Sequence, residues 1–179
     1  MKKIIFLFFY FSILASCAVS NRIIQTGDQN KELKSFKLVQ TPDAYSSGEK
    51  DGQARGQKVK VTSTFLFEER QNARPQITVN YLISMVLKTH TELFYKLDGE
   101  IIKVGSNDQM TDGRFTLPEN LWVSIVHSQK IQCSLQSKKE EIDIELNQSQ
   151  RNKLAEFFQL AIDQLAVKFP AIPKGKKKW

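Results

Sequence analysis

Alternation of apolar and polar residues in the middle of the chain restricts its fold more than any other feature. In residues 58–67, KVKVTSTFLF, apolar side chains alternate with lysine and threonine. The pattern continues over residues 76–88, where six apolar side chains share one face: Ile77, Val79, Tyr81, Ile83, Met85 and Leu87. Successive side chains of a strand point to opposite faces of a sheet. The alternation therefore predicts β-strands with one buried face.

Two further segments indicate β-hairpins. Residues 91–104 contain the pair Asp98-Gly99, which supplies the positive φ angles of a two-residue type I′ turn. Asp98 is therefore predicted to be a turn residue and not a catalytic acid. Residues 130–136 and 141–147 alternate on either side of a polar turn, so they are predicted to pair as a second hairpin.

The end of the chain predicts an amphipathic helix over residues 147–169. Its apolar side chains recur at steps of three and four: Leu154, Phe158, Ala161, Ile162, Leu165 and Phe169. Asn147 and Gln150, three residues apart, have the form of a helix N-terminal capping pair, and Pro170 ends the helix. The apolar face needs a partner, and the apolar side of the predicted sheet is available.

Residues 118–129 fit either of two elements. Their apolar side chains fall at helical spacing: Leu121, Trp122, Ile125 and Val126. The stretch LWVSIV also has strand propensity, but the spacing and Pro118 favour a short helix. The expected fold is α+β: an antiparallel sheet formed as a meander of hairpins, with a short middle helix and a long C-terminal helix packed on one face.

The first residues indicate a targeting segment. Lys2 and Lys3 precede an uncharged apolar run over residues 4–14, and small residues follow it. This order is typical of a secretory signal, and eleven residues are fewer than the roughly 20 that a membrane-spanning helix needs. A short N-terminal transmembrane anchor and a buried core helix are the alternatives.

The sequence LASC, which ends at Cys17, resembles the lipobox of bacterial lipoproteins. The resemblance implies that Cys17 receives a diacylglyceryl group and that a peptidase removes residues 1–16. Two or three long acyl chains, palmitate among them, would then hold the chain to a membrane. Ala18 is not the aspartate that this family uses for inner-membrane retention, so the resemblance implies the periplasmic face of the outer membrane in a source with two membranes.

The rest of the chain divides into a tether, one domain and a tail. Residues 17–34 are polar and mixed, which predicts a tether, and residues 35–173 are predicted to form a single domain. Within it, residues 41–57 are rich in Gly, Ser and Asp without periodicity, so we expect a flexible loop or a disordered segment. Residues 174–179 form a basic tail.

The second cysteine has no partner once the first is acylated. Cys133 alternates with Ile131 and Leu135 on an apolar face. We therefore expect it to be a small buried side chain and not a nucleophile, because no pattern of His, Asp or Asn near it would activate the thiol.

Charge and motifs exclude several classes of function. Of the net charge of +7, Lys2 and Lys3 contribute two positive charges, and the other five belong to the lysines that follow the last acid, Asp163. A basic stripe interleaved with aromatic residues, as nucleic-acid binding requires, is absent. Neither histidine, His90 or His127, belongs to a metal-binding pair, and the sequence holds no phosphate loop or nucleophile elbow. No catalytic residue, metal site or cofactor is predicted.

The basic tail has two interpretations. Its chemistry is that of a membrane-surface anchor, because lysine attracts anionic headgroups and tryptophan favours the interface. The residues concerned are Lys174, Lys176, Lys177, Lys178 and Trp179. The alternative is a solvated chain end.

These observations predict a lipid-anchored lipoprotein of the cell envelope whose domain is a non-catalytic binding or interaction module. Its partners would be the membrane, through the lipid on Cys17, and an envelope protein or polymer. An inhibitor or immunity-type lipoprotein is one alternative. A hydrolase of envelope polymers is another, because residues distant in sequence can assemble a site. The sequence does not indicate an oligomeric state.

Overall fold

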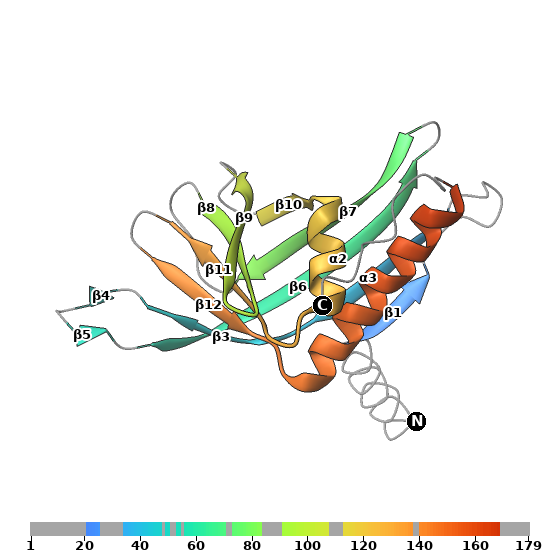
Figure 1. The fold of residues 1–179 in the computed structure, drawn as a ribbon. Helices are drawn as coiled ribbons and strands as arrows, with labels where there is room; N and C mark the ends of the chain where they lie inside the picture. Colours follow the sequence, from blue (N-terminus) through green and yellow to red (C-terminus); the bar gives the residue numbers. More distant parts are fainter. Residues whose placement is uncertain are drawn as a thin grey trace, which may run out of the picture.

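The computed structural model describes residues 21–25, 34–47, 49–50, 53–54, 56–70, 73–83, 91–107, 113–137 and 140–168. Antiparallel strands curve into a half-barrel, and two helices lie side by side against it (Figure 1). The helices are α2 (Glu119–His127) and α3 (Gln148–Lys168).

Twelve strands are present in the described part of the chain. In sequence order they are β1 (Arg22–Gln25), β2 (Ser35–Gln40), β3 (Asp43–Ser46), β4 (Glu49–Lys50), β5 (Gln53–Ala54), β6 (Gln57–Arg70), β7 (Ala73–Ile83), β8 (Thr91–Leu97), β9 (Glu100–Asn107), β10 (Gly113–Leu117), β11 (Ile131–Gln136) and β12 (Glu141–Glu145). β4 and β5 pair with each other as a separate ribbon, and the other ten form the half-barrel.

The long strand β6 joins the two halves of the sheet. On one edge its first residues pair with β3 and its later residues pair with β2, while β7 pairs along the other edge. From β2 the sheet continues to β1, and from β7 it continues to β10. From β3 it continues through β12, β11 and β8 to β9. The order departs from a simple meander because β3 lies between β6 and β12, which are distant in sequence.

The predicted strands are confirmed in β6 and β7. Phe65 and Phe67 are buried on β6, as are Val79 and Tyr81 on β7. Leu82, which points to the opposite face of β7 from Tyr81, is 64% exposed. The last residues of the predicted strand, 84–88, lie outside the described residues.

Both predicted hairpins are also confirmed. β8 and β9 pair around Asp98 and Gly99, whose φ angles of 49° and 99° are both positive, as a type I′ turn requires. β11 pairs with β12 in a register that sets Cys133 opposite Ile144.

The structure resolves residues 118–129 in favour of the helix. α2 begins at Glu119, and its buried side chains are Leu121, Trp122 and Ile125. The indole N–H of Trp122 donates to the carbonyl of Leu117 at 2.9 Å, which satisfies the polar atom of this buried ring. The C-terminal helix is confirmed as α3, with Leu154, Phe158, Ala161 and Leu165 buried.

Two predictions of irregular chain are wrong in part. The expected tether, residues 17–34, contains β1, which pairs with β2. The expected loop, residues 41–57, contains β3, which is enclosed between β6 and β12, and the short ribbon of β4 and β5. β1 and β3 are only four residues long, too short to show periodicity, and their strand form depends on hydrogen bonds to neighbours that are distant in sequence.

An aromatic cluster joins α3 to the sheet. The rings of Phe36 on β2 and Phe67 on β6 stack with centroids 4.5 Å apart. Phe157 of α3 meets Phe36 edge-on at 5.1 Å, and Phe158 meets Phe65 at 6.1 Å. All five rings are buried, so this cluster is the main apolar contact between the helix and β2 and β6.

We predict that Phe157→Ala lowers the free energy of unfolding by about 3–5 kcal/mol, because it opens a cavity at the centre of this cluster. Urea unfolding followed by circular dichroism measures the change. Val167→Ala is the matched control, since Val167 is 79% exposed on the same helix, and it should alter stability by less than about 0.5 kcal/mol. Equal effects of the two changes would contradict the packing described.

Candidate functional site

The predicted site residues lie outside the described part of the chain. Cys17, the basic residues of the tail (Lys174, Lys176, Lys177 and Lys178) and Trp179 are not among the described residues, and neither is His90. The structure does describe Asn21, four residues after Cys17, together with the parts of the domain that hold it.

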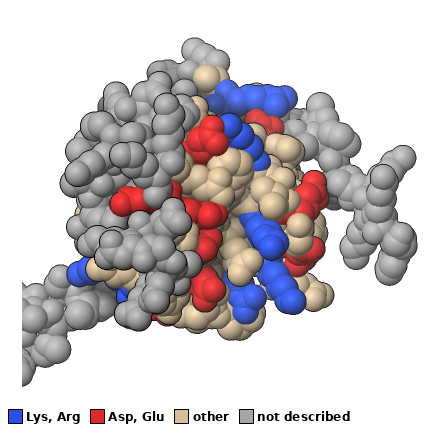
Figure 2. Space-filling view, turned by 90° about the vertical axis from the view of Figure 1, so that its left-hand side faces the viewer, with Lys and Arg blue, Asp and Glu red and all other residues tan. Residues whose placement is uncertain are grey.

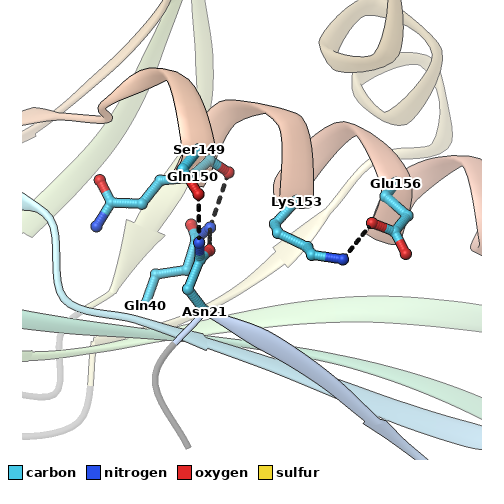
Figure 3. Close-up of polar contacts among 6 residues, drawn as sticks. All are labelled: Asn21, Gln40, Ser149, Gln150, Lys153 and Glu156. Carbon is cyan, nitrogen blue, oxygen red and sulfur yellow. Dashed lines mark hydrogen bonds and ion pairs between the residues drawn. The ribbon is translucent and has the colours of Figure 1, made fainter. Parts of the chain in front are cut away.

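Asn21 is fixed to the domain by its backbone and its side chain. Its backbone N–H donates to the carbonyl of Val39 at 2.6 Å. Its side-chain Nδ2 donates to Oγ of Ser149 at 3.0 Å, and its Oδ1 accepts from Nε2 of Gln40 at 2.9 Å (Figure 3). Asn21 has a φ of 63°, in the left-handed region that asparagine tolerates better than most residues. Asn21, the first residue that the structure describes, is therefore held firmly to the domain.

The first turn of α3 is held at the same point. Gln40, fully buried, also donates from Nε2 to the backbone carbonyl of Gln150 at 2.8 Å. The predicted capping pair is confirmed: the backbone N–H of Gln150 donates to Oδ1 of Asn147, and that of Asn147 donates to Oε1 of Gln150, both at 3.0 Å. Gln150 also donates to the carbonyl of Thr41. We call Asn21, Gln40, Ser149 and Gln150 the entry network.

The sequence did not point to Asn21, Gln40 or Ser149. Single polar residues in polar surroundings carry no pattern, and their contacts join segments more than 100 residues apart. The one signal was the capping pair of Asn147 and Gln150, which located the start of α3.

A polar groove of about 870 Å³ opens beside this turn of α3. The β8–β9 turn, the connection from α2 to β11 and the start of α3 surround it. Its charged and titratable lining residues are Lys96, Asp98, His127, Lys130, Glu145 and Arg151. The lining therefore includes three permanent cations and two carboxylates.

The two carboxylates of the groove differ in their bonding. Asp98 accepts from the backbone N–H groups of Gln129 and Lys130, at 2.8 Å for the latter, so it braces the α2–β11 connection against the β8–β9 turn. The structure thus confirms Asp98 as a turn residue. Arg151 has a similar structural part, because its guanidinium donates to the carbonyl of Gln129 at 3.0 Å and to Gln148 at 2.7 Å. His127 lines the same groove without a hydrogen bond to either carboxylate, as far as the described residues show.

A second hollow, of about 350 Å³, lies on the outer face of β12, β11 and β8. Acidic side chains follow its β12 side, where Glu141, Asp143 and Glu145 alternate on one face. Burial raises the pKa of the Asp143 carboxyl, the charges of Glu141 and Glu145 raise it further, and Lys96 lowers it. Figure 2 shows this side of the molecule, where acidic and basic side chains are interspersed. The large apolar side chain of Ile101, 67% exposed, also lines the hollow.

Three buried polar side chains of the core, Tyr81, Tyr95 and Cys133, contact one another. The hydroxyls of Tyr81 and Tyr95 are hydrogen-bonded at 3.0 Å, and Tyr81 also contacts Sγ of Cys133 at 3.7 Å. Burial raises the pKa of the Cys133 thiol to about 12, and it raises the pKa of both tyrosines well above the usual value. A thiol that stays protonated is a poor nucleophile, so the chemistry of Cys133 is that of the buried side chain predicted for it.

We predict that Cys133 makes the protein less stable at alkaline pH. Above the unfolded thiol pKa of about 8.5, only the unfolded state ionises, so stability is lost as the pH rises toward the folded value, by up to about 1.4 kcal/mol per pH unit. Urea unfolding at several pH values between about 8 and 10 measures this slope.

Cys133→Ala should make that slope shallower, because it removes the thiol. Ser134→Ala, the next residue on β11, should leave the slope as it is. Tyr81 and Tyr95 contribute to the pH dependence of stability in both variants. The effect of the thiol is therefore the difference between the slopes of the two variants. An unchanged slope in Cys133→Ala would show that the thiol does not keep its proton in the folded protein.

Within the residues that the structure describes, no group of three or more His, Cys, Asp or Glu side chains is arranged to hold a metal ion. None of the helices in that part of the chain is both long enough and apolar enough to span a membrane. Comparisons of the chain with protein-family models, with curated proteins and with solved structures found no match.

Proposed function

We propose that the chain is a lipid-anchored binding module of the cell envelope, held to a membrane by acyl chains on Cys17. The observation that carries the proposal is the sequence LASC, ending at Cys17, directly after a basic and then apolar leader. One acyl chain gives reversible attachment, and two or three make it lasting. With Ala18 after the cysteine, the proposed location is the periplasmic face of an outer membrane in a source with two membranes.

The proposed partner is an envelope protein or polymer, and the outer face of β8, β11 and β12 is the surface proposed for it. This face offers an acidic row along β12, the exposed side chain of Ile101 and a hollow between them. Exposed apolar groups beside charged ones are typical of surfaces that bind other molecules. The basic tail, residues 174–179, remains proposed as a second and weaker contact with the membrane.

The anchor is tested by replacing the cysteine in the full precursor, expressed in bacteria supplied with radiolabelled palmitate. We predict that the wild-type chain and the Cys133→Ala variant both incorporate the label and sediment with membranes. Cys17→Ala should carry no label and should be either released or left as an uncut precursor. If Cys17→Ala is processed and remains membrane-bound as before, the anchor is not at this residue.

The partner surface is tested by photocrosslinking in intact cells, with a crosslinking amino acid placed at Ile101 or at Val167. Both side chains are aliphatic and exposed, but Val167 lies on α3, away from the outer face. We predict crosslinks from position 101 and few from position 167; discrete bands would indicate a protein and a continuous smear a polymer. No crosslink at position 101, or equal crosslinks at both positions, would contradict the assignment.

A further inference from the structure

We infer that the domain sits directly on the bilayer, with the end that contains the start of α3 against anionic phospholipid headgroups. This end, which we call the entry end, comprises the entry network, the β8–β9 turn and the α2–β11 connection. The inference rests on the proposed lipid attachment at Cys17 and adds the orientation of the domain and the surface that contacts the membrane.

The distance between lipid and fold is short. Four residue steps separate Cys17 from Asn21, and an extended chain spans at most about 3.6 Å per residue, or about 14 Å in all. Asn21 is held by the carbonyl of Val39, by Gln40 and by Ser149. Because Asn21 contacts Ser149, the acyl chains on Cys17 cannot lie far from the first turn of α3.

Several segments distant in sequence meet at the entry end (Figure 1). Asn21 precedes β1, and Gln40 ends β2, the strand to which β1 is paired. Gln40 contacts the first turn of α3. Arg151, in the same turn, contacts the α2–β11 connection, and Asp98 of the β8–β9 turn contacts that connection as well. The polar groove, which Arg151 lines, therefore opens beside Gln150 of the entry network.

The charge of the groove suits phosphate groups. Of its two carboxylates, Asp98 is engaged by backbone N–H groups and Glu145 is exposed, as are Lys96 and Lys130. With Arg151, the groove is lined by three cations and two carboxylates, an excess of one positive charge. Lysines near an anionic bilayer favour binding by about a factor of five each. A bilayer also supplies phosphate groups at high local concentration, since the lipid at Cys17 would hold the groove beside them. Phospholipid headgroups are therefore the occupant that charge and distance together favour.

The basic tail, proposed above as a second and weaker contact, would give a different orientation if it determined how α3 lies on the membrane. α3 has 21 residues and is about 30 Å long, and the tail follows its far end. A domain that stands on its entry end holds the last turn of α3 away from the bilayer. A domain anchored equally by lipid and tail would instead lie with α3 along the surface. The two orientations predict different depths for the two ends of one helix.

The test uses the lipidated full chain, purified from membranes and placed in vesicles whose headgroups carry a nitroxide quencher. A fluorophore is attached to a single introduced cysteine, either Asn152→Cys near the entry end or Ala166→Cys about 21 Å further along α3. Both positions are exposed. Cys133 is buried and its thiol stays protonated, so the introduced cysteine is the reactive one.

In vesicles containing phosphatidylglycerol we expect quenching at position 152 to be several-fold stronger than at position 166. Adding Lys96→Gln and Lys130→Gln should lower the ratio of docked to undocked domain about fivefold for each lysine, and should have little effect in pure phosphatidylcholine. Deleting residues 174–179 should not change the ratio of quenching between the two positions.

Other results would overturn the inference. Equal quenching that depends on residues 174–179 would show that the tail sets the orientation. Weak quenching at both positions, with the protein still in the vesicles, would show a free domain on a tether. Strong quenching at position 152 that is the same with and without Lys96→Gln and Lys130→Gln would mean that the groove does not bind headgroups. A protein that fails to enter vesicles at all, with no acyl group on Cys17, would instead refute the proposed anchor.

Discussion

The hydrogen bonds of one buried amide, that of Gln40, connect the two ends of the domain. Its Nε2 donates to Oδ1 of Asn21 and to the backbone carbonyl of Gln150, so Asn21 and the first turn of α3 are both held to the end of β2. Burying such a group without partners would cost about 1–3 kcal/mol. Because the amide donates to both segments, their positions are coupled, and the position of Asn21 follows from that of α3.

The aromatic cluster and the entry network act on the same helix in different ways. The stacked and edge-on rings around Phe157 give α3 an apolar contact with the sheet. Apolar packing has little directional preference, whereas the hydrogen bonds of Gln40 and of the capping pair fix where the helix begins. Together they place Arg151 and the polar groove beside Asn21, and the proposed orientation of the domain depends on this placement.

Much of the fold could be predicted from the sequence because its signals are local. The alternation in β6 and β7, the turn at Asp98-Gly99 and the capping pair of α3 each lie within a few residues, and each is confirmed. β1 and β3 could not be predicted, since four-residue strands acquire their form from partners such as Val39 and Ile144 that lie elsewhere in the chain. The groove and the entry network are harder still, because every important contact in them joins distant segments. The proposed attachment point at Cys17, in contrast, rests on the sequence alone.

The proposed membrane attachment depends most on where the mature chain begins. The direct measurement is mass spectrometry of the membrane-extracted protein after trypsin, which should cut after Arg22 and release the peptide CAVSNR. We expect this peptide to start at Cys17 and to carry the mass of a diacylglyceryl group, with or without a further acyl chain on the amine. A peptide that begins at another residue, or one with a free thiol at Cys17, would contradict the proposed lipid attachment at Cys17.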